Sequence, residues 1–198
     1  MSGTKQKLGS EHVKKSISHL IREARICAGT KSEINGEFGV LGFSAMLTIF
    51  PVINSISEAI LNDRNIERTI SYFVREMGSS ASWPIKSPSC SYTDESVIIR
   101  VRNGLVHAMS LPLRILLTKN NADAKTFINS NPNKYDCVIG IEQFIDQVEQ
   151  TAYRIVNENS GIDFDPQGTQ NFGPIDLAPP ISGSAGNVTY SASRRSAE

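Results

Sequence analysis

The segment RNGLVH, at positions 102 to 107, contains three polar side chains that could act together in a chemical reaction. The imidazole of His107 is a candidate general acid or base, because histidine exchanges protons near neutral pH. The guanidinium of Arg102 carries a fork of N–H donors that matches the oxygens of a phosphate group. The amide of Asn103 can orient the imidazole. Together these residue types favour proton transfer beside an anionic group.

These residues fall in the second half of a helix that the sequence predicts at about 94 to 110, ending before Pro112. Thr93 or Ser91 can cap its start. Asp94 and Glu95 follow in the first turn, where the helix dipole favours acidic side chains. The residues expected to point inward are Val97, Ile98, Val101, Leu105 and Met109.

Regular α-helical geometry places the motif residues on two faces. Asn103 and His107 are four residues apart and share a face, whereas Arg102 is offset from His107 by roughly 140°. The long side chain of Arg102 can still curl around the helix to the same cleft. Arg100 lies seven residues before His107, on the same face, and is a second cationic candidate for binding an anionic group. Ser110 is the nearest hydroxyl and a further candidate contact.

Purely structural explanations of the same residues remain open. His107 can be a packed histidine near a helix end, interacting with the C-terminal end of the helix dipole. Arg102 can be one partner of a surface ion pair, which is a common role for arginine. The sequence alone does not choose between these roles and the chemical one.

Helical periodicity recurs along most of the chain. It predicts amphipathic helices at 10–27, 64–77 and 135–158, with Gly78 ending the second, and an apolar central helix at 38–61. The segments LRILLTK and KTFINSN suggest a short β-hairpin, with extended coil as the alternative. Trp83 is expected to anchor the loop at 78–92. The fold class is therefore all-α: an antiparallel bundle of four or five helices at 10–158, with a small hairpin insertion as an option.

The C-terminal segment, residues 159–198, is rich in Gly, Pro and Ser and has no apolar periodicity. We predict a disordered tail there, because few large apolar residues remain to offset the entropy of ordering.

Composition limits the classes of function. The 20 basic and 20 acidic residues cancel, so any nucleic-acid contact should be local and small. The three cysteines have no metal-ligand spacing, so we expect no metal site, no cofactor and no disulfide framework. The polar N-terminus does not resemble a signal peptide, which favours a cytoplasmic protein. The uncharged stretch at 38–57 is expected to be a core helix, and a membrane span is the alternative.

The segment VRNGLVHAMSLP, on a late helix of a small helical bundle, resembles the signature of the HEPN family. That signature is an arginine, then four to six residues, then a histidine. The resemblance is strong over six residues and weak over the helix order at 10–158. Many HEPN proteins are metal-independent ribonucleases that act as dimers, with the motifs of the two protomers meeting at the interface. They are common in toxin–antitoxin and defence systems.

The resemblance implies a role for each motif residue. His107 would be the general acid or base of RNA cleavage, Arg102 would bind the scissile phosphate, and Asn103 would orient the imidazole or the ribose. It also implies a homodimer, RNA as substrate and an antitoxin or operon partner. Active members often have a polar or aromatic residue where this chain has Met109. The second hypothesis is therefore a catalytically inactive HEPN-like bundle that binds RNA, a nucleotide or a partner protein.

Overall fold

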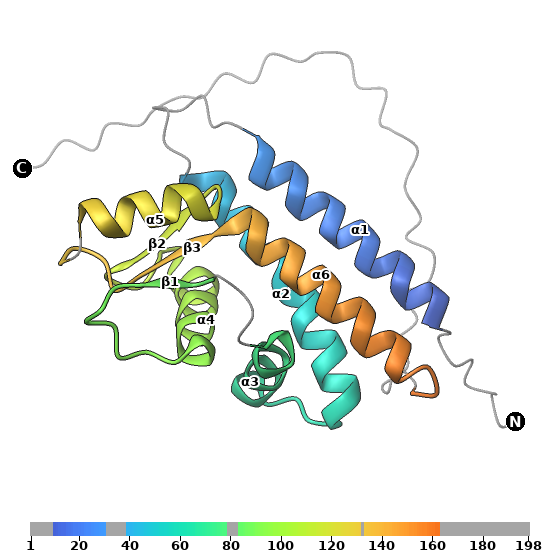
Figure 1. The fold of residues 1–198 in the computed structure, drawn as a ribbon. Coiled ribbons are helices and arrows are strands. Elements are labelled where there is room, and N and C mark those ends of the chain that lie inside the picture. Colours follow the sequence, from blue (N-terminus) through green and yellow to red (C-terminus); the bar gives the residue numbers. More distant parts are fainter. Residues whose placement is uncertain (1–9, 31–38, 79–82, 132, 163–198) are drawn as a thin grey trace, which may run out of the picture. The chain divides into compact units, whose positions relative to one another are not determined.

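The computed structural model describes residues 10–30, 39–78, 83–131 and 133–162, and Figure 1 shows the fold. This part of the chain is mostly helical and has a small three-stranded sheet. The α-helices are α1 (Ser10–Gly29), α2 (Gly39–Leu61), α3 (Ile66–Met77), α4 (Asp94–Asn103), α5 (Asn121–Ser130) and α6 (Ile141–Glu158). A π-helical turn, η1 (Gly104–Ala108), follows α4. The strands are β1 (Ile85–Lys86), β2 (Ile115–Thr118) and β3 (Cys137–Gly140).

The main core lies among the long helices. Helices α1, α2 and α6 pack against one another, and Figure 1 shows their axes side by side. Helix α3 packs against α2, α4 and α6. The largest fully buried side chains include Ile21, Met46, Ile49, Ile53, Phe73, Ile98, Leu105 and Phe144. The predicted helices at 10–27 and 64–77 are confirmed, and so is the one at 38–61 over its described residues, 39–61. Gly78 ends α3 with a φ of 73°.

The predicted β-hairpin is wrong, because the segment forms a βαβ unit. Strands β2 and β3 are parallel, and parallel strands need a crossover, which α5 supplies. Helix α5 occupies the segment where the second hairpin strand was expected. The side chain of Asn120 caps this helix by accepting a hydrogen bond from the N–H of Asp123. Strand β1 pairs antiparallel with the other side of β3, so the strand order is β1-β3-β2.

The predicted helix at 135–158 starts later than expected. Its first residues form strand β3, and α6 begins at Ile141 and ends at Glu158. Trp83 anchors the loop before β1 as expected, since only 3% of it is exposed and its ring meets Phe144 edge-on at 4.7 Å. The predicted tail, residues 159–198, lies outside the described residues from position 163 onward.

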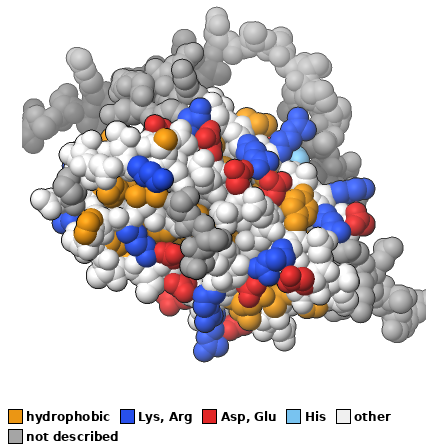
Figure 2. Space-filling view, viewed as in Figure 1, with side chains coloured by type: hydrophobic (Ala, Val, Ile, Leu, Met, Phe, Trp, Pro, Cys, Tyr) orange, Lys and Arg blue, Asp and Glu red, His pale blue; other side chains and the backbone are white. Residues whose placement is uncertain are grey.

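Ion pairs on the surface connect helices that are distant in sequence. Arg25 of α1 binds Asp146 and Glu149 of α6, at 2.7 and 2.6 Å. Arg154 of α6 binds Glu76 of α3 at 2.9 Å. Figure 2 shows basic and acidic side chains interspersed over the face it presents, so this face has no broad region of a single charge.

Helix α2 has the length and composition of a membrane span over Gly42–Leu61, and 50% of that stretch is buried inside the protein. The core helix of a soluble protein has the same properties. Because Met46, Ile49 and Ile53 are fully buried against the other helices, we describe α2 as a core helix.

Candidate functional site

Helix α4 places the motif at the surface by burying its opposite side. Thr93 caps the helix by accepting a hydrogen bond from the N–H of Ser96, and Asp94 and Glu95 occupy the first turn, as predicted. Val97, Ile98 and Val101 are fully buried, which fixes the rotation of the helix about its axis. The side of α4 that carries Ile99, Arg102 and Asn103 is consequently half-buried.

The helix widens into the π-turn η1 within the motif. The N–H of Met109 bonds to the carbonyl of Gly104, five residues back, and Ser110 donates to the same oxygen at 3.2 Å. Met109 then takes a left-handed conformation, with a φ of 49°, which ends the turn. The expectation that Met109 points inward is therefore wrong, and 73% of it is exposed.

Glycine is required at the start of this turn because the chain folds back closely over it. A Cβ atom on Gly104 would lie 2.5 Å from the carbonyl oxygen of Ser110 and 3.2 Å from Cδ of Pro112. Both distances are shorter than ordinary van der Waals contact. The absence of a side chain at position 104 therefore permits the turn.

The π-turn brings the three motif residues together. The Nη1 atom of Arg102 donates to Oδ1 of Asn103 at 3.1 Å and lies 3.4 Å from Nε2 of His107. On a regular α-helix Arg102 and His107 would be offset, and the wider π-turn reduces this offset.

The exposure of these groups suits binding a molecule from solution. His107 is exposed rather than packed, while Arg102 and Asn103 are half-buried. Within the described part of the chain, no carboxylate forms an ion pair with Arg102. Nε2 of His107 and the guanidinium of Arg102 are 3.4 Å apart, so the two groups can contact the same bound molecule. The site therefore offers a guanidinium and an imidazole side by side.

The two additional candidates do not join this cluster. The guanidinium of Arg100 lies over the ring of Tyr92, 4.5 Å from its centroid, in a cation–π contact. Ser110 is exposed, and its described hydrogen bond is the one from its backbone N–H to Gly104.

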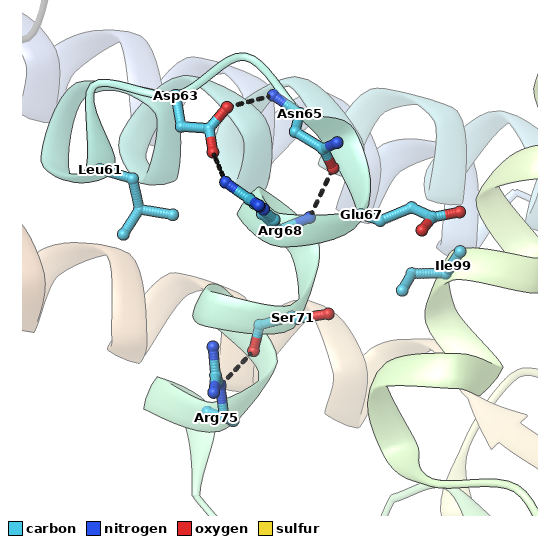
Figure 3. Close-up of a pocket in the computed structure, with 8 residues that line it drawn as sticks. All are labelled: Leu61, Asp63, Asn65, Glu67, Arg68, Ser71, Arg75 and Ile99. Atoms are coloured by element: carbon cyan, nitrogen blue, oxygen red, sulfur yellow. Dashed lines mark hydrogen bonds and ion pairs between the residues drawn. The ribbon is translucent and has the colours of Figure 1, made fainter.

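A groove next to α4 was not anticipated from the sequence. It has a volume of about 590 Å³, and α3 forms its floor between the end of α2 and α4. Figure 3 shows the residues that line it: Leu61, Asp63, Asn65, Glu67, Arg68, Ser71, Arg75 and Ile99. The signal in the sequence was the spacing of Arg68, Ser71 and Arg75, which share the face of α3 opposite its buried stripe.

Two acidic residues, Asp63 and Glu67, offset the positive charge of the arginines in this groove. The backbone N–H of Asn65 and the guanidinium of Arg68 hold the pKa of Asp63 below its usual range, so Asp63 is a carboxylate engaged by its neighbours. Glu67 lies toward Ile99 in Figure 3. The Nε atom of Arg75 donates to the carbonyl of Ser71 at 3.1 Å, and no carboxylate of the described residues pairs with its guanidinium.

Within the described ranges, no group of three His, Cys, Asp or Glu side chains is placed to hold a metal ion. No family model matches the chain, and comparisons with curated proteins and with solved structures find no match. What defines the molecule is therefore a mostly helical fold, a βαβ unit with one added strand, and the Arg102–Asn103–His107 cluster.

Proposed function

We propose that the protein is a HEPN-like, metal-independent endoribonuclease that acts as a dimer. The contact between Arg102 and His107 carries this proposal, because it pairs a phosphate-binding group with a proton-transfer group at the surface. The fold supports it, since a late helix of a mostly helical domain carries the motif. The finer assignment, an antiparallel HEPN-like bundle of four or five helices, is part of the proposal.

In the proposed reaction, a phosphate oxygen of RNA binds the guanidinium of Arg102. This bond competes for Nη1 and releases Nε2 of His107, which accepts the proton of the 2′-hydroxyl. The 2′-oxygen attacks phosphorus, the bond to the 5′-oxygen breaks, and that oxygen takes a proton from an acid. The products are a 2′,3′-cyclic phosphate and a 5′-hydroxyl. Arg102 offsets the negative charge that develops on the phosphate oxygens.

The same reaction needs a base and an acid at once, and one imidazole supplies only one of them. A second copy of the motif across a dimer interface provides the other. Three exposed apolar side chains flank His107 and support such an interface: Val106 at 42%, Met109 at 73% and Leu113 at 92% exposure. Contiguous apolar surface beside a polar site is typical of protein–protein contacts.

A second function, binding RNA, a nucleotide or a partner protein without cleavage, is favoured by Met109. That residue stands where active HEPN proteins often have a polar or aromatic side chain, and it points into solvent. For either function we propose a cytoplasmic protein that works with an antitoxin or another operon partner in defence or stress response, without a membrane.

The test is incubation of the purified full-length protein with total RNA in EDTA. Cleavage that His107→Ala abolishes supports the ribonuclease. Binding of RNA without cleavage by the wild-type protein supports the second function instead. Equal cleavage by wild type and His107→Ala would overturn the assignment of the site.

A further inference from the structure

We infer that the groove between α3 and α4 binds the single-stranded RNA segment that leads to the scissile phosphate. This inference rests on the proposed ribonuclease function, because it assigns the substrate of that site as a single strand. The groove residues are those shown in Figure 3.

The position of the groove connects it with the motif. Ile99 forms one wall, and Arg102 and Asn103 follow it by three and four residues on the same side of α4. Three residues, about 4.5 Å along the axis, therefore separate the groove wall from the proposed phosphate-binding arginine.

The floor of the groove carries a row of side chains that can bind successive phosphates. Arg68, Ser71 and Arg75 follow one another along α3, and the two arginines are two helical turns apart, about 10.5 Å. A guanidinium matches phosphate oxygens, and that of Arg75 has no carboxylate partner among the described residues, whereas that of Arg68 also pairs with Asp63. Leu61 and Ile99 supply apolar walls against which the flat faces of bases can pack.

The acidic residues of the groove favour a short strand over a long polyanion. Asp63 is held by Arg68 and by the N–H of Asn65, so its charge is largely compensated. Glu67 remains at the edge and repels phosphates that pass close to it. We therefore expect the groove to contact few phosphates of the RNA, and the affinity for RNA to depend only weakly on salt concentration.

The test measures binding separately from cleavage. The probe is a fluorescein-labelled 12-nucleotide oligo(U) RNA, and its anisotropy is titrated with full-length His107→Ala protein, with and without Arg75→Ala. We expect Arg75→Ala to weaken binding about tenfold, as for loss of one charge-assisted hydrogen bond. The slope of log affinity against log salt should become shallower by about 0.7, the value for one phosphate on a single strand.

The matched control is Arg22→Ala, which removes an exposed arginine from α1 and should leave the affinity unchanged. If Arg22→Ala and Arg75→Ala weaken binding equally, the groove is not the binding site. A poly-glutamate peptide that binds as tightly as oligo(U) would also overturn the inference, because it would show an acidic peptide to be an equivalent ligand. Circular dichroism checks that both variants are folded.

Kinetics of the otherwise wild-type protein distinguish failure of the inference from failure of the proposed function. Arg75→Ala should raise KM for the 12-nucleotide RNA and leave kcat unchanged, and it should not affect a dinucleotide that is too short to enter the groove. If Arg75→Ala cleaves the RNA with an unchanged KM, the groove does not bind the substrate, and the proposed ribonuclease function is unaffected. If the wild-type protein does not cleave RNA but binds it in a way that depends on Arg75, the groove is a binding site and the proposed ribonuclease function is wrong.

Discussion

The guanidinium of Arg102 lies 3.4 Å from Nε2 of His107, across a π-helical turn that begins at Gly104. Five residues separate the two side chains, which would place them on different faces of an α-helix. The wider turn reduces this offset. The geometry of the candidate site thus depends on the backbone of η1 as well as on the arginine side chain.

Substitution Gly104→Ala should therefore disturb both stability and activity. The new Cβ would lie 2.5 Å from the carbonyl oxygen of Ser110, and a backbone atom cannot move aside like the end of a flexible side chain. We expect a loss of about 1–3 kcal/mol in the free energy of unfolding, measured in urea, together with reduced RNA cleavage.

The control for this variant is Gly29→Ala at the end of α1, where no atom of the described residues outside the adjacent backbone lies within 4 Å of the added Cβ. That protein should be at least as stable as wild type, because alanine favours helices more than glycine does. Wild-type stability and activity in Gly104→Ala would show that the turn tolerates a side chain and that our account of Gly104 is wrong.

The core around Phe144 should be sensitive to truncation. Phe144 is fully buried and contacts the ring of Trp83, the one tryptophan of the chain. We expect Phe144→Ala to cost about 3–5 kcal/mol, because it leaves a cavity in the core. Tryptophan fluorescence should shift to the red as water reaches Trp83.

Phe127→Ala is the matched control, since 43% of Phe127 is exposed on α5. A surface substitution of this kind should change stability by less than about 0.5 kcal/mol and leave the emission of Trp83 as it is. Equal losses in the two variants, measured by urea unfolding, would contradict the placement of the core.

The three cysteines should differ in reactivity. Burial raises the pKa of the Cys137 thiol, because its thiolate would lose solvation inside the protein. Cys27 and Cys90 are partly exposed. With a thiol reagent at pH 8, we expect Cys27 and Cys90 to react in the folded protein and Cys137 to react only after unfolding in urea. Simultaneous reaction of all three would contradict the buried position of β3.

The long helices could be predicted from sequence because each carries an apolar stripe over several turns. The βαβ unit could not, since strand β3 is an apolar run that continues directly into the inner face of α6, and periodicity merges the two. Helix α5 was missed for a related reason. Phe127 and Ile128 suggest a strand, whereas the cap at Asn120 sets the segment as a helix.

The candidate site was predictable in its residue types and not in its geometry. Arg102, Asn103 and His107 stood out as three polar residues in an aliphatic segment, and the structure brings them into contact. Their alignment comes from η1, and Gly104 is its one visible sign in the sequence. The groove on α3 was overlooked because Arg68 and Arg75 look like the ordinary solvent-exposed face of an amphipathic helix.

The most direct test of the central claim is a double-mutant cycle on single-turnover cleavage of RNA at pH 7 in EDTA. We expect His107→Ala and Arg102→Ala each to slow cleavage by about 10²- to 10⁴-fold, and the double variant to be no slower than the slower single one, because the two residues act as a unit. Wild-type rates in either single variant, or losses that multiply in the double variant, would contradict the account.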